Sequence, residues 1–150
     1  MLGSLAPAEI DSFIGNHCYG HLGCHAKGKT YVVPISYAYS KGVLIGQTKE
    51  GLKTQMLREN PQCCVQIESV EGIADWVSVI AWGEFEELKG HEANEAMRLL
   101  IDRLSPHIED FESSRSPRDV TPGRVDQKPQ VDIVYQIKLT EMTGRFESSK

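Results

Sequence analysis

The sequence lacks any apolar run that approaches the ~20 residues a membrane-spanning helix needs. It also lacks an excess of basic residues: 16 Lys and Arg stand against 21 Asp and Glu, giving a net charge of −5 at pH 7. This balance argues against non-specific binding to nucleic acid or to an anionic membrane. The N-terminal stretch MLGSLAPAEIDSF has no basic region followed by an apolar one, so we expect no signal peptide.

Cysteine is scarce, with four residues in the chain, and nothing in the sequence indicates secretion. We therefore expect reduced thiols and a cytoplasmic protein. Two cysteines and three histidines fall within residues 17–25, but their spacing is not a standard zinc pattern. If this segment is a strand, His21 and His25 point away from Cys24. We predict no metal site.

The remaining composition is that of one soluble globular domain. Hydrophobic residues make up 40% and charged residues 25% of the 150 residues. A chain of this length is a normal single-domain size, and it shows no internal repeat. We predict a single domain over residues 1–150.

Hydrophobic periodicity predicts a mainly β fold with about six strands and three helices. The strands are expected at residues 21–26, 31–39, 43–48, 63–69, 75–88 and 131–140, and the helices at residues 8–16, 52–59 and 91–104. Hairpin connections make neighbouring strands antiparallel, and many short strands favour a closed or nearly closed barrel. Residues 105–130 are rich in proline and charge, and we predict a long loop or arm there.

The predicted strand at residues 31–39 is apolar on both faces, which indicates that both faces are covered and permits a dimer. Pro34 removes one backbone donor from this strand. Proline is confined to sheet edges and bulges, so we predict an edge or a bulge at this position.

A lysine, Lys53, stands in the first turn of the predicted helix at residues 52–59. The partial positive charge of a helix N-terminus disfavours a cation there. A bound anion would explain it, held by free backbone N–H groups, Lys53 and the hydroxyl of Thr48. The alternative interpretation is a solvated lysine on an exposed turn.

Several blocks in order carry a resemblance to a known family. They are Gly20–Gly23, Tyr31–Tyr37, Gly46–Thr48, Glu50–Lys53, Arg58–Pro61, Cys63–Val65 and Trp76–Val79 with Gly83. Over roughly residues 6–104, and again from Val131 to about Arg145, the sequence resembles the FMN-binding split β-barrel proteins related to pyridoxamine 5′-phosphate oxidase. Within these it is most similar to the flavin-nucleotide-binding and nitroimidazole-resistance-type subgroup.

The resemblance implies a split β-barrel, FMN as cofactor, and a homodimer with flavin sites at the subunit interface. It places the flavin ring along the backbone of Val33, Pro34, Ile35 and Ser36. It also places the phosphate at Thr48, Gly51 and Lys53, and brings Ser78 toward the cofactor. For Ser78, a local structural hydrogen bond is the alternative.

The sequence also departs from the family. Tyr37 stands where the oxidases carry a substrate-binding lysine, and residues 144–150 lack their C-terminal segment rich in Trp and Arg. We therefore do not expect a true pyridoxamine 5′-phosphate oxidase. Ile45 and Gln47 replace the tyrosine and histidine of nitroreductase-like relatives, which argues against nitro-group chemistry.

The function expected from these residues is an FMN-dependent oxidoreductase that uses a small-molecule electron donor or acceptor. No side chain stands out as a catalytic acid or base, and flavin chemistry does not require one. One alternative is a flavin-binding or sensing module without turnover. Another is haem binding through His17, His21 or His25, and a deazaflavin in place of FMN also fits the sequence.

Overall fold

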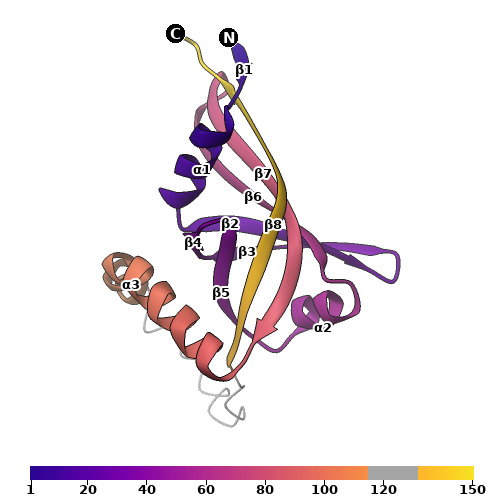
Figure 1. The fold of residues 1–150 in the computed structure, drawn as a ribbon. Coiled ribbons are helices and arrows are strands. Elements are labelled where there is room, and N and C mark those ends of the chain that lie inside the picture. Colours follow the sequence, from indigo (N-terminus) through magenta and orange to yellow (C-terminus); the bar gives the residue numbers. More distant parts are fainter. Residues whose placement is uncertain (115–131) are drawn as a thin grey trace.

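The computed structural model describes residues 1–114 and 132–150, and side chains at 108–114 are not among those described. Eight strands and three helices follow in this order: β1 (Leu2–Ser4), α1 (Pro7–Gly15), β2 (Tyr19–Ala26), β3 (Lys29–Ser36), β4 (Ala38–Ser40), β5 (Val43–Lys49), α2 (Leu52–Glu59), β6 (Gln62–Gly72), β7 (Asp75–Leu88), α3 (Gly90–Ser114) and β8 (Asp132–Glu147). Figure 1 shows the long strands β6, β7 and β8 running through the molecule, with the two termini near one end.

The strands form one antiparallel sheet in the order β3-β2-β6-β7-β8-β5-β4, and β1 pairs with β8. β3 and β4 are consecutive in the chain but lie at opposite ends of this order, so the sheet has to curl. The ends approach where β3 contacts β5. Tyr37 follows β3 on this path, and its backbone N–H extends the β2–β3 pairing by donating to the carbonyl of Cys18 at 2.9 Å. The result is the mainly β split barrel that the sequence predicts.

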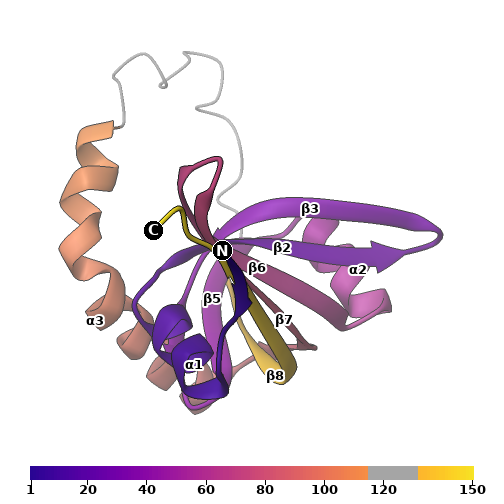
Figure 2. The ribbon, with the colours of Figure 1, turned by 90° about the horizontal axis from the view of Figure 1, so that it is seen from above.

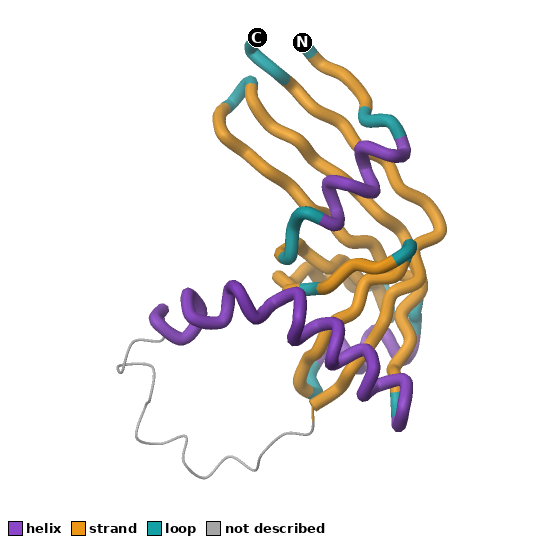
Figure 3. Tube along the Cα trace, turned by 60° about the vertical axis from the view of Figure 1, so that its left-hand side comes forward, coloured by secondary structure: helices purple, strands orange, loops and turns teal. Residues whose placement is uncertain are grey.

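The helices cover different parts of this sheet. Viewed from above, α3 lies on one side of the molecule, while α2 lies with the β2–β3 hairpin on the other (Figure 2). α1 runs beside the strands toward the termini, and α3 crosses below it (Figure 3). No described helix is both long and apolar enough to span a membrane.

The barrel interior is filled by aliphatic side chains that alternate along the strands, including Leu22, Val65, Ile67 and Ile137, all fully buried. A second, smaller cluster joins the buried face of α3 to the sheet. Tyr135 of β8 is also buried and lies opposite Gly46 of β5. A Cβ atom at position 46 would stand 2.4 Å from the Tyr135 hydroxyl oxygen, so the ring occupies the space that a larger residue would fill.

Three sequence predictions are confirmed in detail. α2 spans the predicted residues and ends before Pro61, and β7 has the predicted bounds. Pro34 lies on β3, which is an edge strand. The structure adds that Lys41 and Gly42, with φ values of 49° and 79°, have the conformation of a two-residue type I′ turn between β4 and β5.

The predicted single strand at residues 31–39 is wrong, because the chain breaks it at Tyr37 into β3 and β4. The Tyr37 side chain is buried, and its hydroxyl donates to the carbonyl of Ile14 at 2.7 Å. This residue carries the chain across the gap between the two ends of the sheet. The number of strands therefore exceeds the predicted six, and the three-residue strand β1 adds another.

The predicted loop at residues 105–130 is wrong for its first part, because α3 continues to Ser114. Pro106 lies inside this helix and cannot donate to the carbonyl of Asp102. The Ser105 hydroxyl donates to that carbonyl instead, at 3.3 Å, which supplies a partner for the acceptor left free. The rest of the predicted loop lies outside the described residues.

One further prediction is wrong, because the last strand does not end at Thr140 but continues to Glu147. On the second apolar face of β3, Val32 is 61% exposed in a single chain, and cover of this face by a second copy stays a prediction.

Gly83 of β7 lies at a register shift in the pairing with β8, and its replacement should destabilise the fold. The register against β8 shifts between Trp82 and Gly83, and a Cβ at position 83 would stand 2.4 Å from the carbonyl oxygen of Lys138. We expect Gly83→Ala to lower the free energy of unfolding by about 1–3 kcal/mol in urea denaturation. Gly72→Ala is the control, because the nearest atom to its Cβ lies 3.9 Å away. Equal stability of the two variants would contradict this role for Gly83.

Candidate functional site

The connection from β5 to α2 presents free backbone donors. Gly51 is the residue before the first turn of α2 and has no side chain to cap it. The buried Thr54 hydroxyl accepts from the Gly51 N–H at 3.0 Å, so that donor is satisfied. The N–H groups of Leu52, Lys53 and Thr54 belong to the first turn and have no partner within the helix. This end of α2 therefore carries partial positive charge.

Lys53 brings a full positive charge to the same turn. Its side chain is half-buried, and no hydrogen bond or ion pair joins it to the described part of the chain. Burial lowers the pKa of the Lys53 ammonium, and a smaller opposing effect comes from the Cys24 thiol on β2. The side chain is thus held toward the sheet rather than fully solvated. A bound anion would stabilise the charged form of a half-buried lysine that has no carboxylate partner.

Thr48 lies at the end of β5, two residues before Glu50. Its hydroxyl donates to the backbone carbonyl of Lys49 at 3.2 Å. Lys49 itself is paired with Asp132 of β8. Thr48, Gly51 and Lys53 lie within one short stretch from the end of β5 to the first turn of α2, and their binding of a phosphate stays a prediction.

The neighbouring acidic groups are bound by one arginine. Arg58, in the last turn of α2, contacts Glu50 through two nitrogens and Glu87 of β7 through Nε. These bonds lower the pKa of the Glu50 carboxyl. The acidic residues near the start of α2 are thereby neutralised on the side of the helix that faces β7.

The predicted ring-binding residues lie along the edge strand β3. Ile35 is buried and Val33 is half-buried, while Pro34 and Ser36 are exposed on the other face. The outer backbone of β3 has no strand partner in the sheet. It therefore offers backbone groups to a flat ligand.

A cavity of about 310 Å³ opens where β3 ends. Its wall combines Ser36, Tyr19 of β2 and Gln47 of β5 with one face of α3, contributed by Met97, Leu100, Ile101, Leu104 and His107. The cavity has the volume of a small ligand site and mostly apolar walls. Helical periodicity in the sequence puts Met97, Leu100 and Leu104 on one apolar side of this helix, but it gives no signal that they border an opening.

Ser78 is not brought to α2 within one chain. It lies on β7, three strands from β3 in the sheet, and its hydroxyl accepts from the Gln66 amide at 3.1 Å. Gln66 pairs with His21, and His21 pairs with Pro34. Ser78 and Pro34 therefore share the exposed face of the sheet.

The histidines of residues 17–25 do not converge. His21 and His25 are exposed, whereas Cys24 between them is buried, as strand alternation predicts. A ring nitrogen of His17 lies 2.7 Å from the Phe13 carbonyl oxygen. Within residues 1–114 and 132–150, no three His, Cys, Asp or Glu side chains come close enough to hold a metal ion.

The sequence analysis missed Arg58 and its two acidic partners. A signal was available for one pair, because residues 50, 54 and 58 are four apart and share one flank of a helix. The sequence gives no such signal for Glu87, since it is distant from Arg58 in the sequence.

Comparison with known proteins gives the relatives of this fold and site. An uncharacterized protein of Rhizobium meliloti is 29% identical over 135 residues, which cover 83% of this chain and 81% of that protein. The crystal structure of an FAD-binding protein of Mesorhizobium loti superposes with a TM-score of 0.75 at 26% identity, covering 99% of each chain. A proposed 5-nitroimidazole antibiotic resistance protein of Bacteroides thetaiotaomicron shares the fold, with a TM-score of 0.68 at 19% identity, covering 97% of this chain and 87% of that one.

One family model accounts for nearly the whole chain. The model described as pyridoxamine 5′-phosphate oxidase matches residues 6–146, which include every strand from β2 to β7 and almost all of β8. The relatives and the split-barrel topology agree with this match. The chain therefore belongs to the pyridoxamine 5′-phosphate oxidase family.

Proposed function

We propose that this protein binds FMN and acts as an oxidoreductase on a small-molecule electron donor or acceptor. The observation that carries the proposal is Lys53 in the first turn of α2, within a member of this family. Its side chain is half-buried and has no hydrogen-bond or ion-pair partner among the described residues. The family supplies the class of cofactor. The free N–H groups and Lys53 supply a place for its phosphate.

The proposed binding mode uses the two elements that flank the end of the barrel. Lys53, Thr48 and the N–H groups after Gly51 bind the phosphate. The backbone of Val33–Ser36 runs beside the ring. Bound FMN would supply the redox chemistry, while the chain positions it and excludes water.

The cavity beside Ser36 is the proposed place of the reacting partner. Leu100 and Leu104 on α3 keep its wall apolar, and the Gln47 amide and Ser36 hydroxyl offer hydrogen bonds. An apolar wall excludes water from a reacting ligand.

We also propose a homodimer, with the exposed face of the sheet as the contact between copies. Val32 is 61% and Trp82 39% exposed on this face, which also carries Pro34 and Ser78. A second copy seated there would bury apolar surface and could bring Ser78 toward the partner's cofactor. This arrangement would explain why one chain alone leaves Ser78 far from α2.

The first test is the absorption spectrum after adding FMN and removing the excess. We expect wild type to retain a two-band flavin spectrum and Lys53→Met to bind FMN at least about tenfold more weakly, because a charge-assisted contact is lost. Its apo form should lose no stability, since an unpaired half-buried charge is removed. Lys29→Ala, which removes an exposed lysine of β3, is the control. Equal affinity of Lys53→Met and wild type would remove Lys53 from the site.

The pKa of Lys53 gives the site a pH dependence. Burial lowers this pKa, so the ammonium loses its proton at lower pH than an ordinary lysine. The phosphate favours the protonated form, so FMN affinity should fall as pH rises through the Lys53 pKa. Titrations of wild type and Lys53→Arg across alkaline pH should diverge, because arginine stays charged. Coincident profiles would contradict the role of the lysine.

The dimer proposal predicts that FMN binding depends on assembly. Dilution to monomer, followed by sedimentation with detection at a flavin wavelength, should release FMN in step with dissociation. A monomer that keeps stoichiometric flavin would contradict an interfacial site.

A flavin-binding module without turnover would use the same residues. Reduction of bound FMN by a nicotinamide nucleotide, followed anaerobically as bleaching of the flavin bands, separates the two functions. Bleaching supports the oxidoreductase, and persistent bands with every donor tested support the sensing module.

A further inference from the structure

We propose that Arg58 is a positioning residue of the phosphate site, because it keeps the carboxylates of Glu50 and Glu87 from competing with the bound anion. This inference rests on the proposed function, since the anion is the phosphate of FMN. Arg58 itself needs no contact with the ligand.

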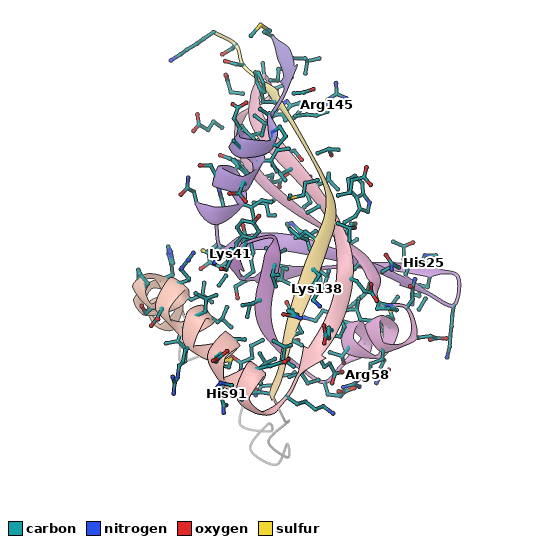
Figure 4. The ribbon with its side chains drawn as sticks, in the orientation of Figure 1. His25, Lys41, Arg58, His91, Lys138 and Arg145 are labelled. Carbon is teal, nitrogen blue, oxygen red and sulfur yellow. The ribbon has the colours of Figure 1, made fainter. Side chains whose placement is uncertain are left out.

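The three side chains form one tightly bonded group. Arg58 Nη1 and Nη2 contact the two Glu50 oxygens at 2.5 and 2.8 Å, and Nε contacts Glu87 Oε1 at 2.5 Å. The paired planar geometry is the strongest form of this contact. Figure 4 shows Arg58 beside α2, and the bond to Glu87 places its guanidinium on the side of that helix facing β7.

Glu50 is placed where its negative charge would affect anion binding at the start of α2. It directly precedes Gly51, so it adjoins the free N–H groups of the first turn. Residues 50, 54 and 58 follow one flank of the helix, whereas Lys53 lies on another flank and approaches Cys24 of β2. The carboxylate is thus held along the Thr54–Arg58 flank, and Lys53 remains free for the ligand.

Loss of Arg58 would change the charge at this end of α2 in two ways. It would leave Glu50 and Glu87 as unpaired negative groups, which repel a phosphate dianion. It would also free Glu50 to move toward the helix N-terminus, where the partial positive charge attracts a carboxylate. Both effects weaken binding of an external anion.

The experiment is a double-mutant cycle on FMN affinity. At low salt we expect Arg58→Gln to bind FMN roughly threefold to tenfold more weakly than wild type, and less so in high salt, where exposed charges are screened. Glu50→Gln in the Arg58→Gln background should restore most of the affinity. Glu50→Gln alone should bind as well as wild type, because Arg58 keeps its contact with Glu87.

Arg98→Gln is the matched control, since it removes the same charge from an exposed position on α3. It should leave affinity unchanged. Unfolding curves of all variants test for structural loss, which should be small because the Arg58 side chain is 44% exposed.

The outcomes are distinct. Weakening that Glu50→Gln reverses supports the proposal, because a merely structural Arg58 would not be rescued by removing its partner's charge. Weakening without rescue, or unchanged affinity in Arg58→Gln, overturns it while wild-type FMN binding stands. Wild type that binds no FMN overturns the proposed function and this inference together.

Discussion

The chain has to pass from one end of its sheet to the other between two consecutive strands, and Tyr37 makes that passage. Its N–H donates to Cys18, its hydroxyl donates to Ile14, and its ring is buried. Burial raises its pKa, so the hydroxyl remains a donor at any ordinary pH. This closure sets β3 near β5, and so brings Ser36, Gln47 and one face of α3 together around the cavity. The position of the candidate site therefore depends first on the strand topology and only then on the side chains.

Around α2 the charges are sorted by helix face. The flank toward β7 carries a closed group of one arginine and two glutamates. The flank toward β2 carries Lys53, whose pKa is lowered by burial and raised by the nearby Cys24 thiol. In the proposed phosphate site, neutralisation of the two carboxylates would contribute to anion binding together with the charge of Lys53.

Local features were readable from the sequence where local chemistry decides the structure. The end of α2 follows from Pro61, and the edge position of Pro34 follows from its missing backbone N–H. The break at Tyr37 was not readable, because residues 31–39 are apolar except for Ser36 and only the closure of the sheet interrupts them. The helix beyond Leu104 was missed because Pro106 normally ends helices, and the compensating Ser105 hydroxyl is visible only in the fold. For the site, the position of Lys53 was readable, but its burial depends on β2, and the pairing of Arg58 with Glu87 depends on β7.

The contact of Gly46 with Tyr135 has a consequence for how this sequence can diverge. A side chain at position 46 would overlap the Tyr135 ring, since a Cβ atom there would stand 2.4 Å from the Tyr135 hydroxyl oxygen. Neither position can therefore change freely on its own. An alanine at position 46 requires a side chain smaller than tyrosine at position 135. A smaller side chain at position 135 leaves a void, which a side chain larger than glycine at position 46 would fill. Among homologous sequences, positions 46 and 135 are therefore expected to covary.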